Sequence, residues 1–330
     1  MKAIVYQEYG SSDALELKEV DRPCPGDNEV LIKVYAASIN DWDWGLLQGT
    51  PFTNRLQNGL LKPKKYKILG SDIAGRIEAV GKDVEQFQPG DEVYGDLTGY
   101  WGGFAEYVCV GENALVLKPA CMTFEEAAAI PQAAMLAVQG LIDKGQIQSG
   151  QKLLINGAGG GVGTFGVQIA KLYGVEVTGV DSSGKLDMMR TIGFDHVIDY
   201  AKEDFTRNGQ CYDLILDNKM NRSVFDYMRA LSPGGIYVAT GGSMPSLFQA
   251  LLLGPLISML SKKSIHIVFL KPNKDLAYMN RLFEEGKVKP VIDGPFKLSE
   301  VPEAIRYFGE GKHKGKVVIT VQHINETAPA

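Results

Sequence analysis

The residues with the clearest chemistry form a glycine run between a short apolar stretch and a helical pattern. Gly157-Ala158-Gly159-Gly160-Gly161-Val162-Gly163 follows the apolar residues 153–155 and precedes a segment with helical apolar spacing. Glycines let the backbone approach a phosphate, and the N–H groups that begin a helix point at the anion. A second apolar stretch, 175–180, ends in Asp181, which could accept hydrogen bonds from a ribose. This order predicts a βαβ dinucleotide-binding unit rather than a glycine-rich surface loop.

The chain around this unit changes character near residue 123. Residues 1–122 read as short strands separated by proline and glycine turns, which is typical of a mostly β domain of barrel type. From Thr123, which forms a capping-box pattern with Glu126, helices and strands alternate, as in a doubly wound parallel sheet. The last 60 or so residues do not extend that sheet. We therefore predict an α/β fold with a Rossmann-type nucleotide-binding domain, 123–270, inserted into a catalytic domain made of 1–122 and 271–330.

Length and composition narrow the class of protein. The 330 residues suit two domains of about 150 each. A net charge of −5 provides no basic surface for nucleic acid. The four cysteines are scattered, which fits neither a disulfide framework nor a four-thiolate zinc site. The first residues lack the apolar core of a signal peptide, so we predict a cytoplasmic protein.

The most apolar segment, 247–260, is shorter than the ~20 residues needed to span a bilayer. It also contains Gly254 and Pro255, which are poor residues for a helix interior. We predict a buried or cleft-facing helix pair there, in preference to contact with a membrane or a partner, and hence no stable membrane insertion. The residues after Gln322 are polar and predict a loose tail.

Several longer stretches resemble one known family. They include residues 36–49 (AASINDWDWGLLQG), 69–81 (LGSDIAGRIEAVG), 102–108 (GGFAEYV), 128–141 (AAIPQAAMLAVQGL) and 231–242 (LSPGGIYVATGG). With these stretches the chain resembles the medium-chain dehydrogenases/reductases, and among them the zinc-independent quinone oxidoreductase branch. The resemblance implies a GroES-like catalytic domain beside the Rossmann domain. It also implies a homodimer that pairs edge strands, for which residues 264–270 are the candidate here.

The same resemblance sets an expectation about metal. Zinc-dependent relatives have a cysteine where this chain has Asn40, and a His-Glu pair where it has Ser71 and Asp72. Zinc sites are built mostly from cysteine, histidine and carboxylate. All four histidines lie at or beyond His196, so the first 195 residues contain none. We therefore predict no metal and specifically no zinc.

Without a Lewis acid, hydride transfer to a quinone or activated alkene is easier than oxidation of a simple alcohol, since the acceptor delocalises the incoming charge. By resemblance, Asn40 and Asp43 line the nicotinamide end of the cleft and are the catalytic candidates. The alternative for Asp43 is a structural carboxylate that fixes its own loop. Trp42 and Trp44 could form an aromatic wall for a flat substrate, although core packing suits one of them equally well.

The chain also departs from the quinone oxidoreductases near the substrate. A tyrosine and an arginine common in that branch are replaced by Gly45 and Leu47, and a threonine by Leu136. The loss of these polar groups predicts a less polar pocket, suited to a bulky apolar electrophile rather than a small quinone. Tyr100 is one of several tyrosines that could donate a proton, and water could serve instead.

The resemblance assigns cofactor-binding residues for NAD(P)H along the predicted Rossmann domain and at one position beyond it. The residues expected at the pyrophosphate are Ala158, Gly160, Gly161, Val162 and Gly163, with Asp181 at the ribose and Ser182, Lys185 and Tyr200 at a 2′-phosphate. Those expected near the nicotinamide are Gly241, Gly242, Phe269, Leu270 and Lys316. Solvated surface positions are the alternative for Ser182, Lys185 and Lys316. Because Asp181 favours the free ribose, we predict that NADH is at least accepted.

The function expected from the sequence is therefore a metal-free NAD(P)H-dependent oxidoreductase. It would transfer hydride to a quinone or an α,β-unsaturated carbonyl, with a small-molecule apolar electrophile as its substrate. Two alternatives stay open: a zinc-free alcohol or carbonyl dehydrogenase, and a non-catalytic NAD(P)H-binding sensor. Cofactor consumption with a panel of quinones and enones, with and without chelator, would separate them.

Overall fold

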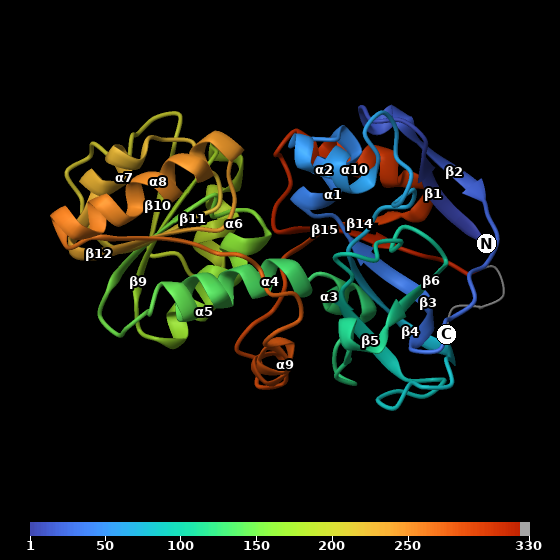
Figure 1. Cartoon of the computed structure of the whole chain (residues 1–330). Coiled ribbons are helices and arrows are strands. Elements are labelled where there is room, and N and C mark those ends of the chain that lie inside the picture. Colours follow the sequence, from blue (N-terminus) through green and yellow to red (C-terminus); the bar gives the residue numbers. More distant parts are fainter. Residues whose placement is uncertain (324–330) are drawn as a thin grey trace. The chain divides into compact units, whose positions relative to one another are not determined.

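The structure is a computed structural model that describes residues 1–323, and these form two compact units (Figure 1). The first unit comprises 1–132, 272–280 and the residues from 292 onward, and the second comprises 133–271 and 281–291. The predicted division at 122/123 differs from this one by ten residues. The reason is that helix α3 (Phe124–Ala128) packs on the strands of the first unit, mainly β3 and β4. Residues 324–330, most of the tail predicted after Gln322, lie outside the described residues.

The first unit is built around a seven-stranded sheet in the order β14-β15-β3-β4-β5-β7, with β6 paired to β3. Its strands are β3 (Glu29–Ser38), β4 (Asp72–Val80), β5 (Glu92–Asp96), β6 (Tyr107–Gly111), β7 (Val116–Leu117), β14 (Ile292–Lys297) and β15 (Lys316–Thr320). All pairs are antiparallel except β14 with β15. Strands β1 (Lys2–Tyr6) and β2 (Leu15–Glu19) form a separate hairpin. Alternate residues of β3, such as Val30, Ile32 and Val34, are fully buried in the core.

Three helices of the first unit bear on the site. Helix α1 (Asp41–Gln48) follows β3, α2 (Phe52–Asn58) follows α1, and α10 (Val301–Gly309) precedes β15. Helix α10 begins with a proline in its first turn and buries Val301, Ala304 and Ile305 against the core. Helices α4 (Pro131–Val138) and α9 (Leu276–Glu284) each contribute to both units.

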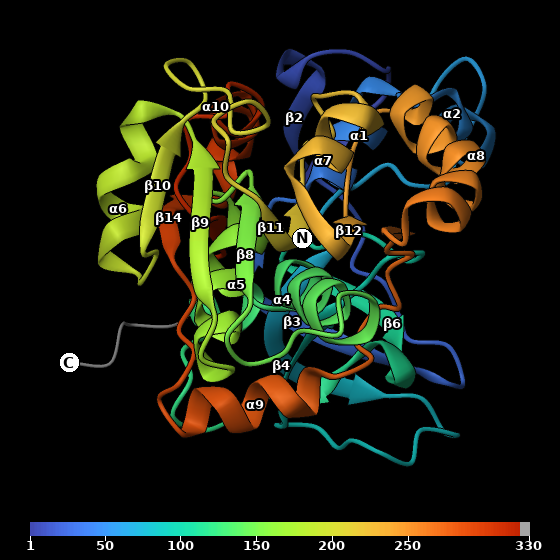
Figure 2. The ribbon, with the colours of Figure 1, turned by 90° about the vertical axis from the view of Figure 1, so that its left-hand side faces the viewer.

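The second unit contains a six-stranded parallel sheet in the order β10-β9-β8-β11-β12-β13. Its strands are β8 (Lys152–Asn156), β9 (Glu176–Asp181), β10 (His196–Asp199), β11 (Tyr212–Asp217), β12 (Leu231–Ala239) and β13 (Ser264–Ile267). Its helices include α5 (Gly161–Leu172), α6 (Leu186–Thr191) and α7 (Val224–Ala230). Figure 2 shows β8, β9 and β10 side by side. Strand order reverses between β8 and β11, which makes the carboxyl ends of these two strands the topological switch point. The predicted fold class is confirmed.

The apolar segment around Gly254 and Pro255 departs from the prediction. It forms one helix, α8 (Met244–Ser261), and not a helix pair. Gly254 lies against Ile265 of β13, so the small residue serves packing and does not end the helix. Phe248, Leu252 and Met259, among others, are exposed. Among the described residues α8 alone is long and apolar enough to cross a membrane, and 11% of it is buried, so the expectation of a buried helix is wrong.

Candidate functional site

The glycine turn of the second unit joins β8 to α5 and forms an anion site. Gly160 is the N-cap residue of α5, and within the described chain no side chain caps it. The first backbone N–H bonded back into the helix is that of Thr164, which donates to Gly160 O at 3.0 Å. The N–H groups of residues 161–163 are therefore free to meet a negatively charged group. These residues fit the pyrophosphate of a dinucleotide.

The turn itself leaves little space for side chains. A Cβ on Gly163 would lie 2.4 Å from the Ala158 carbonyl oxygen, and a Cβ on Gly159 would lie 2.6 Å from Lys185 Cδ. Glycine at these two positions is thus required by close backbone and side-chain approach. Of the five residues predicted at the pyrophosphate, Ala158 is fully buried beneath the turn and the other four begin α5.

Asp181 lies at the end of β9 and faces the turn. Its Oδ2 accepts a hydrogen bond from Gly159 N at 2.8 Å, and its Oδ1 accepts one from Ser182 N at 2.8 Å. Lys185 Nζ lies 3.5 Å from Oδ1, with the lysine and aspartate side chains only 6% and 10% exposed. Lys185 is therefore not a solvated surface residue. Tyr200 donates its backbone N–H to the Asp181 carbonyl at 3.2 Å. The residue predicted at the ribose, Asp181, and the three predicted at a 2′-phosphate therefore lie together.

A buried hydrogen-bond network holds the carboxyl ends of the central strands, and sequence reasoning missed it. Asp217, at the end of β11, accepts from Asn156 Nδ2 at 2.8 Å and from the Tyr237 hydroxyl at 2.7 Å. Burial and the Asp217 charge raise the pKa of Tyr237, so the phenol stays a donor. The next residue, Asn218, accepts from Thr240 Oγ1 at 2.5 Å. The detectable signal was Asp217-Asn218 directly after a buried strand.

The residues predicted near the nicotinamide continue from these strand ends. Gly241 and Gly242 follow β12, and a Cβ on Gly241 would lie 3.1 Å from the Asn218 carbonyl oxygen. Phe269 and Leu270 follow β13, and Phe269 is exposed. Their contact with a cofactor stays a prediction.

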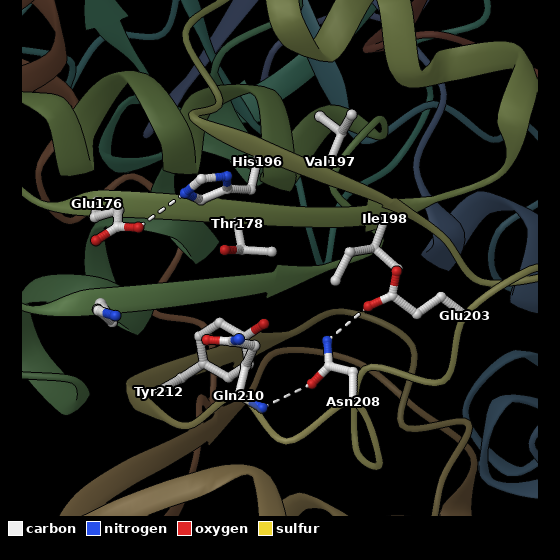
Figure 3. A pocket seen from close by; sticks show the side chains of 10 residues that line it. Glu176, Thr178, His196, Val197, Ile198, Glu203, Asn208, Gln210 and Tyr212 are labelled. Carbon is white, nitrogen blue, oxygen red and sulfur yellow. Dashed lines mark hydrogen bonds and ion pairs between the residues drawn. The ribbon is translucent and has the colours of Figure 1, made fainter.

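A pocket of about 330 Å³ lies elsewhere on the same sheet (Figure 3). Lys152, Glu176, His196 and Tyr212, which begin β8 to β11, line it. His196 Nε2 lies 2.8 Å from Glu176 Oε1. Because these are the amino ends of the strands, the pocket is at the opposite edge from the glycine turn and is not the nucleotide site.

In the first unit, Asp43 ties together two distant backbone positions. Its Oδ2 accepts from Asn40 N at 2.9 Å, and its Oδ1 accepts from Gly70 N at 2.8 Å. The side chain is fully buried, and burial raises the pKa of Asp43 to about 7, against the opposing effect of these two hydrogen bonds. This geometry is that of a carboxylate that fixes its own loop. A catalytic role for Asp43 stays a prediction.

The Asn40 side chain is held at both ends. Its Nδ2 donates to Ser71 Oγ at 3.0 Å, and its Oδ1 accepts a short hydrogen bond from Lys316 Nζ. Lys316 also donates to the Ile39 carbonyl at 3.2 Å and to Asp72 Oδ2 at 3.3 Å. Lys316 is 4% exposed, so it is a buried cation of the first unit and not simple surface charge. Its predicted contact with the cofactor is untested.

Asp72 and Asp96 complete this group, which we call the buried polar cluster: Asn40, Asp43, Ser71, Asp72, Asp96 and Lys316. Asp72 and Asp96 are paired residues on the antiparallel strands β4 and β5. Within the described chain, Asp72 Oδ1 and Asp96 Oδ2 have no hydrogen-bond partner. Burial, reinforced by the charge of Asp72, raises the pKa of Asp96 to about 7, and burial likewise raises the pKa of Asp72. The sequence singled out Asn40, Asp43, Ser71, Asp72 and Lys316 separately, but nothing in it indicated that they form one cluster with Asp96.

The cluster does not fit a zinc ion. Asn40 and Ser71 contribute neutral oxygen and nitrogen groups that are already hydrogen-bonded to each other, and the Lys316 ammonium lies among the oxygens. In residues 1–323 no three His, Cys, Asp or Glu side chains gather in a way that could hold a metal. Zinc sites of the usual kind need such a set.

The residues predicted to line the substrate pocket are differently placed. Trp44 packs on α10, where a Cβ on Gly309 would lie 2.3 Å from its ring, so Trp44 belongs to the core contacts. Trp42 and Tyr100 are about half exposed, and Leu136 on α4 is partly buried. Leu47 is fully buried and a Cβ on Gly45 would lie 2.8 Å from the Thr50 carbonyl oxygen. These two positions therefore pack the first unit and do not by themselves make a pocket less polar.

Comparison with known proteins agrees with this geometry. Residues 26–120 match the family described as alcohol dehydrogenase GroES-like domain, and residues 192–319 match the family described as zinc-binding dehydrogenase. A 2-methylene-furan-3-one reductase of Solanum lycopersicum is 35% identical, covering 97% of this chain and 79% of its own. An NADPH-dependent alkenal/one oxidoreductase, chloroplastic, of Arabidopsis thaliana is 32% identical over the same shares. The structure of the quinone oxidoreductase from Coxiella burnetii has a TM-score of 0.87 and 27% identity, covering 98% of this chain and 99% of its own.

Proposed function

Because the chain belongs to the medium-chain dehydrogenase/reductase superfamily, we propose that it is an NAD(P)H-dependent reductase of quinones or α,β-unsaturated carbonyls that works without zinc. The observation that carries the proposal is the open amino end of α5, combined with relatives named as enone, alkenal and quinone reductases over nearly the whole chain. An electron-poor acceptor suits such an enzyme because conjugation spreads the charge that it receives.

The second unit supplies the nucleotide site. When bound, NAD(P)H supplies the hydride. The free N–H groups of residues 161–163 offset the pyrophosphate charge, and Asp181 and Lys185 stand where the adenosine ribose is expected. The Asp217 network fixes the strand ends from which Asn218 and Gly241 extend. In this proposal each of these groups orients the cofactor for the reaction.

The first unit supplies polar groups without a Lewis acid. The donor set of the buried polar cluster does not fit zinc, which supports a reaction that leaves no simple alkoxide to be stabilised. We propose that Asn40 serves the acceptor as a hydrogen-bond donor and that Asp43 fixes its position. A small-molecule apolar electrophile is the proposed substrate, in keeping with the names of the relatives, a furanone reductase and an alkenal/one oxidoreductase.

We further propose a homodimer and a cytoplasmic location. The outer edge of β13 has no partner strand among the described residues, and such an edge is a template for pairing with a second copy. Light scattering at micromolar concentration should give twice the 36.0 kDa chain mass, and a purely monomeric result would contradict the dimer.

The test of function is cofactor consumption with a panel of enones, alkenals and quinones, each with NADPH and NADH. Turnover that a chelator leaves unchanged is the expected result. Tight cofactor binding without turnover on any acceptor would replace the enzyme by a sensor. Turnover lost on chelation, together with one zinc per chain, would overturn the metal-free mechanism.

A further inference from the structure

The Lys316 ammonium is saturated by the first unit. An ammonium has three N–H donors, and Lys316 directs them at the Ile39 carbonyl, Asn40 Oδ1 and Asp72 Oδ2. Ile39 and Asn40 lie between β3 and α1, and Asp72 begins β4, whereas the lysine begins β15. Lys316 therefore connects, through one buried charge, the three segments that carry the buried polar cluster.

Lys316 is also the positive group that acts on the acidic residues of the cluster. Burial raises the pKa of Asp43, of Asp72 and of Asp96, and the charge of Lys316 reduces that rise in each case. Three carboxyl groups thus share one cation in a part of the molecule that excludes water. Asp72 Oδ2 takes a further hydrogen bond from Gln132 N at 3.2 Å, while Asp72 Oδ1 is left without a partner in residues 1–323.

The bond from Lys316 to Asn40 has a chemical consequence. A cation on the amide oxygen draws electron density from the amide, which makes Asn40 Nδ2 a stronger hydrogen-bond donor. Ser71 Oγ takes one of the two N–H bonds of Nδ2 and fixes the plane of the amide. The second N–H is thereby fixed in direction as well, and the proposed function makes it the donor to the acceptor oxygen.

We propose that Lys316 is a positioning residue of this reductase, whose ammonium orients and polarises the Asn40 amide for the negative charge that develops on the acceptor oxygen. The proposal rests on the proposed function. Lys316 acts through Asn40 and does not itself touch the acceptor.

The competing explanation is that Lys316 only neutralises Asp72 and so holds the fold. Two variants separate the explanations. Lys316→Met removes the charge and keeps the length of the side chain. The double variant Lys316→Met/Asp72→Asn also removes the carboxylate, so it leaves no unpaired charge between these two positions and restores thermal stability in either case.

Lys118 offers a matched control. It is equally buried, donates to the Met122 carbonyl at 2.5 Å and the Pro119 carbonyl at 3.1 Å, and pairs with Glu92 at 3.0 Å. Lys118→Met should therefore lower the Tm in a similar way without touching the cluster. Its kcat should stay within about twofold of the wild type, since no interaction specific to the transition state is lost.

The measurements are kcat, KM for both substrates and Tm for the three variants, with NADPH and one enone. Loss of a polarised donor should reduce kcat by about tenfold to a hundredfold in Lys316→Met and leave the cofactor KM unchanged. In the double variant the Tm should recover and kcat should not. A double variant that regains wild-type kcat would overturn the proposal.

A second readout is independent of turnover. The side-chain amide resonance of Asn40, identified by its loss in Asn40→Asp, should shift in Lys316→Met and in the double variant but not in Lys118→Met. An unchanged resonance would overturn the proposal even for a protein that reduces no acceptor. A wild type without turnover on any acceptor, by contrast, overturns the proposed function alone.

Discussion

Asp181 and Lys185, four residues apart, form an ion pair of 3.5 Å in which both side chains are almost wholly buried. Two unit charges ~4 Å apart interact by about 1 kcal/mol in water and about 4 kcal/mol at the effective dielectric constant of a protein surface. Lys185 therefore offsets much of the repulsion that Asp181 would exert on a 2′-phosphate. The carboxylate retains one oxygen on the glycine turn, so the pair is compatible with both nicotinamide cofactors.

The first prediction follows for cofactor choice. Wild type should use NADH as well as NADPH, and Asp181→Ser should shift the ratio of kcat/KM values toward NADPH by about tenfold, because the lysine is released to the phosphate. Lys185→Met should shift the ratio the other way. Lys202→Met, on an exposed lysine that pairs with Asp199, serves as the control. Equal ratios in wild type and Asp181→Ser would show that Asp181 does not face the ribose.

A second prediction concerns the glycine turn. Gly160 has extended backbone angles, φ −90° and ψ −179°, which valine adopts readily. Gly160→Val should therefore fold and lose cofactor binding, because its side chain stands before the free N–H groups of α5. Gly163→Val should instead lower the Tm, since its Cβ would overlap the Ala158 carbonyl oxygen. Fluorescence titration with NADPH and thermal unfolding distinguish the two, and an unchanged affinity in Gly160→Val would move the pyrophosphate elsewhere.

The third prediction is about Asp43. Asparagine can accept only one of the two backbone hydrogen bonds that Asp43 accepts, and its Nδ2 would face an N–H donor. Asp43→Asn should cost about 1–3 kcal/mol of stability. It should also lower kcat while sparing cofactor affinity, since Asn40 loses its backbone anchor. Identical kinetics in the two proteins would reduce Asp43 to a purely structural residue.

A fourth prediction is a pH dependence with a definite sign. The folded-state pKa of Asp96 is raised from 3.8 to about 7, so its contribution to stability is present below pH ~4 and lost as the pH rises through 7. Asp96→Asn keeps the amide oxygen for Thr98 and removes the charge of the unpartnered oxygen. Its Tm should exceed that of the wild type by a few degrees at pH 8 and match it near pH 4.

Asp195 should show the opposite dependence of stability on pH and serves as a comparison. Burial alone would raise the pKa of Asp195, but the Lys171 ammonium and the Val177 N–H together outweigh it and lower the pKa, so the contribution of Asp195 to stability is lost as the pH falls. Asp195→Asn should therefore reduce the Tm at pH 8 and have less effect in acid. If Asp96→Asn is no more stable than the wild type at pH 8, Asp96 is not a strained carboxylate.

The fifth prediction concerns the zinc content of the protein. Purified protein should contain no stoichiometric zinc, because the Lys316 ammonium and the hydrogen-bonded Asn40 and Ser71 leave no soft donor set. Mass spectrometry of the metals should find far less than one zinc per chain. One zinc per chain, removed together with activity, would refute the metal-free mechanism.

Structure that depends on local sequence patterns could be predicted from the sequence, whereas contacts between distant residues could not. The glycine turn and the Thr123–Glu126 capping box were predicted and are formed as expected, because each depends on residues within a few positions. Lys316 reaches Asn40 across 276 positions, and no local pattern encodes that contact. The apolar composition of α8 suggested a buried helix, but the helix is mostly exposed. Burial depends on whether another surface packs against the helix, which composition does not reveal.

The two hydrogen bonds of the Asp43 carboxylate close the chain between residues 43 and 70 into a loop. One carboxylate keeps Asn40 and Gly70 together, so exposed residues between them can vary without moving either end. Lengthening a loop costs little, about 0.6 kcal/mol for each doubling. Phe52, Leu56 and Leu61 of this loop are exposed. Exchanging exposed residues of this loop between relatives is therefore a way to seek enzymes for new acceptors, since the hydrogen bonds of Asp43 to Asn40 and Gly70 stay in place.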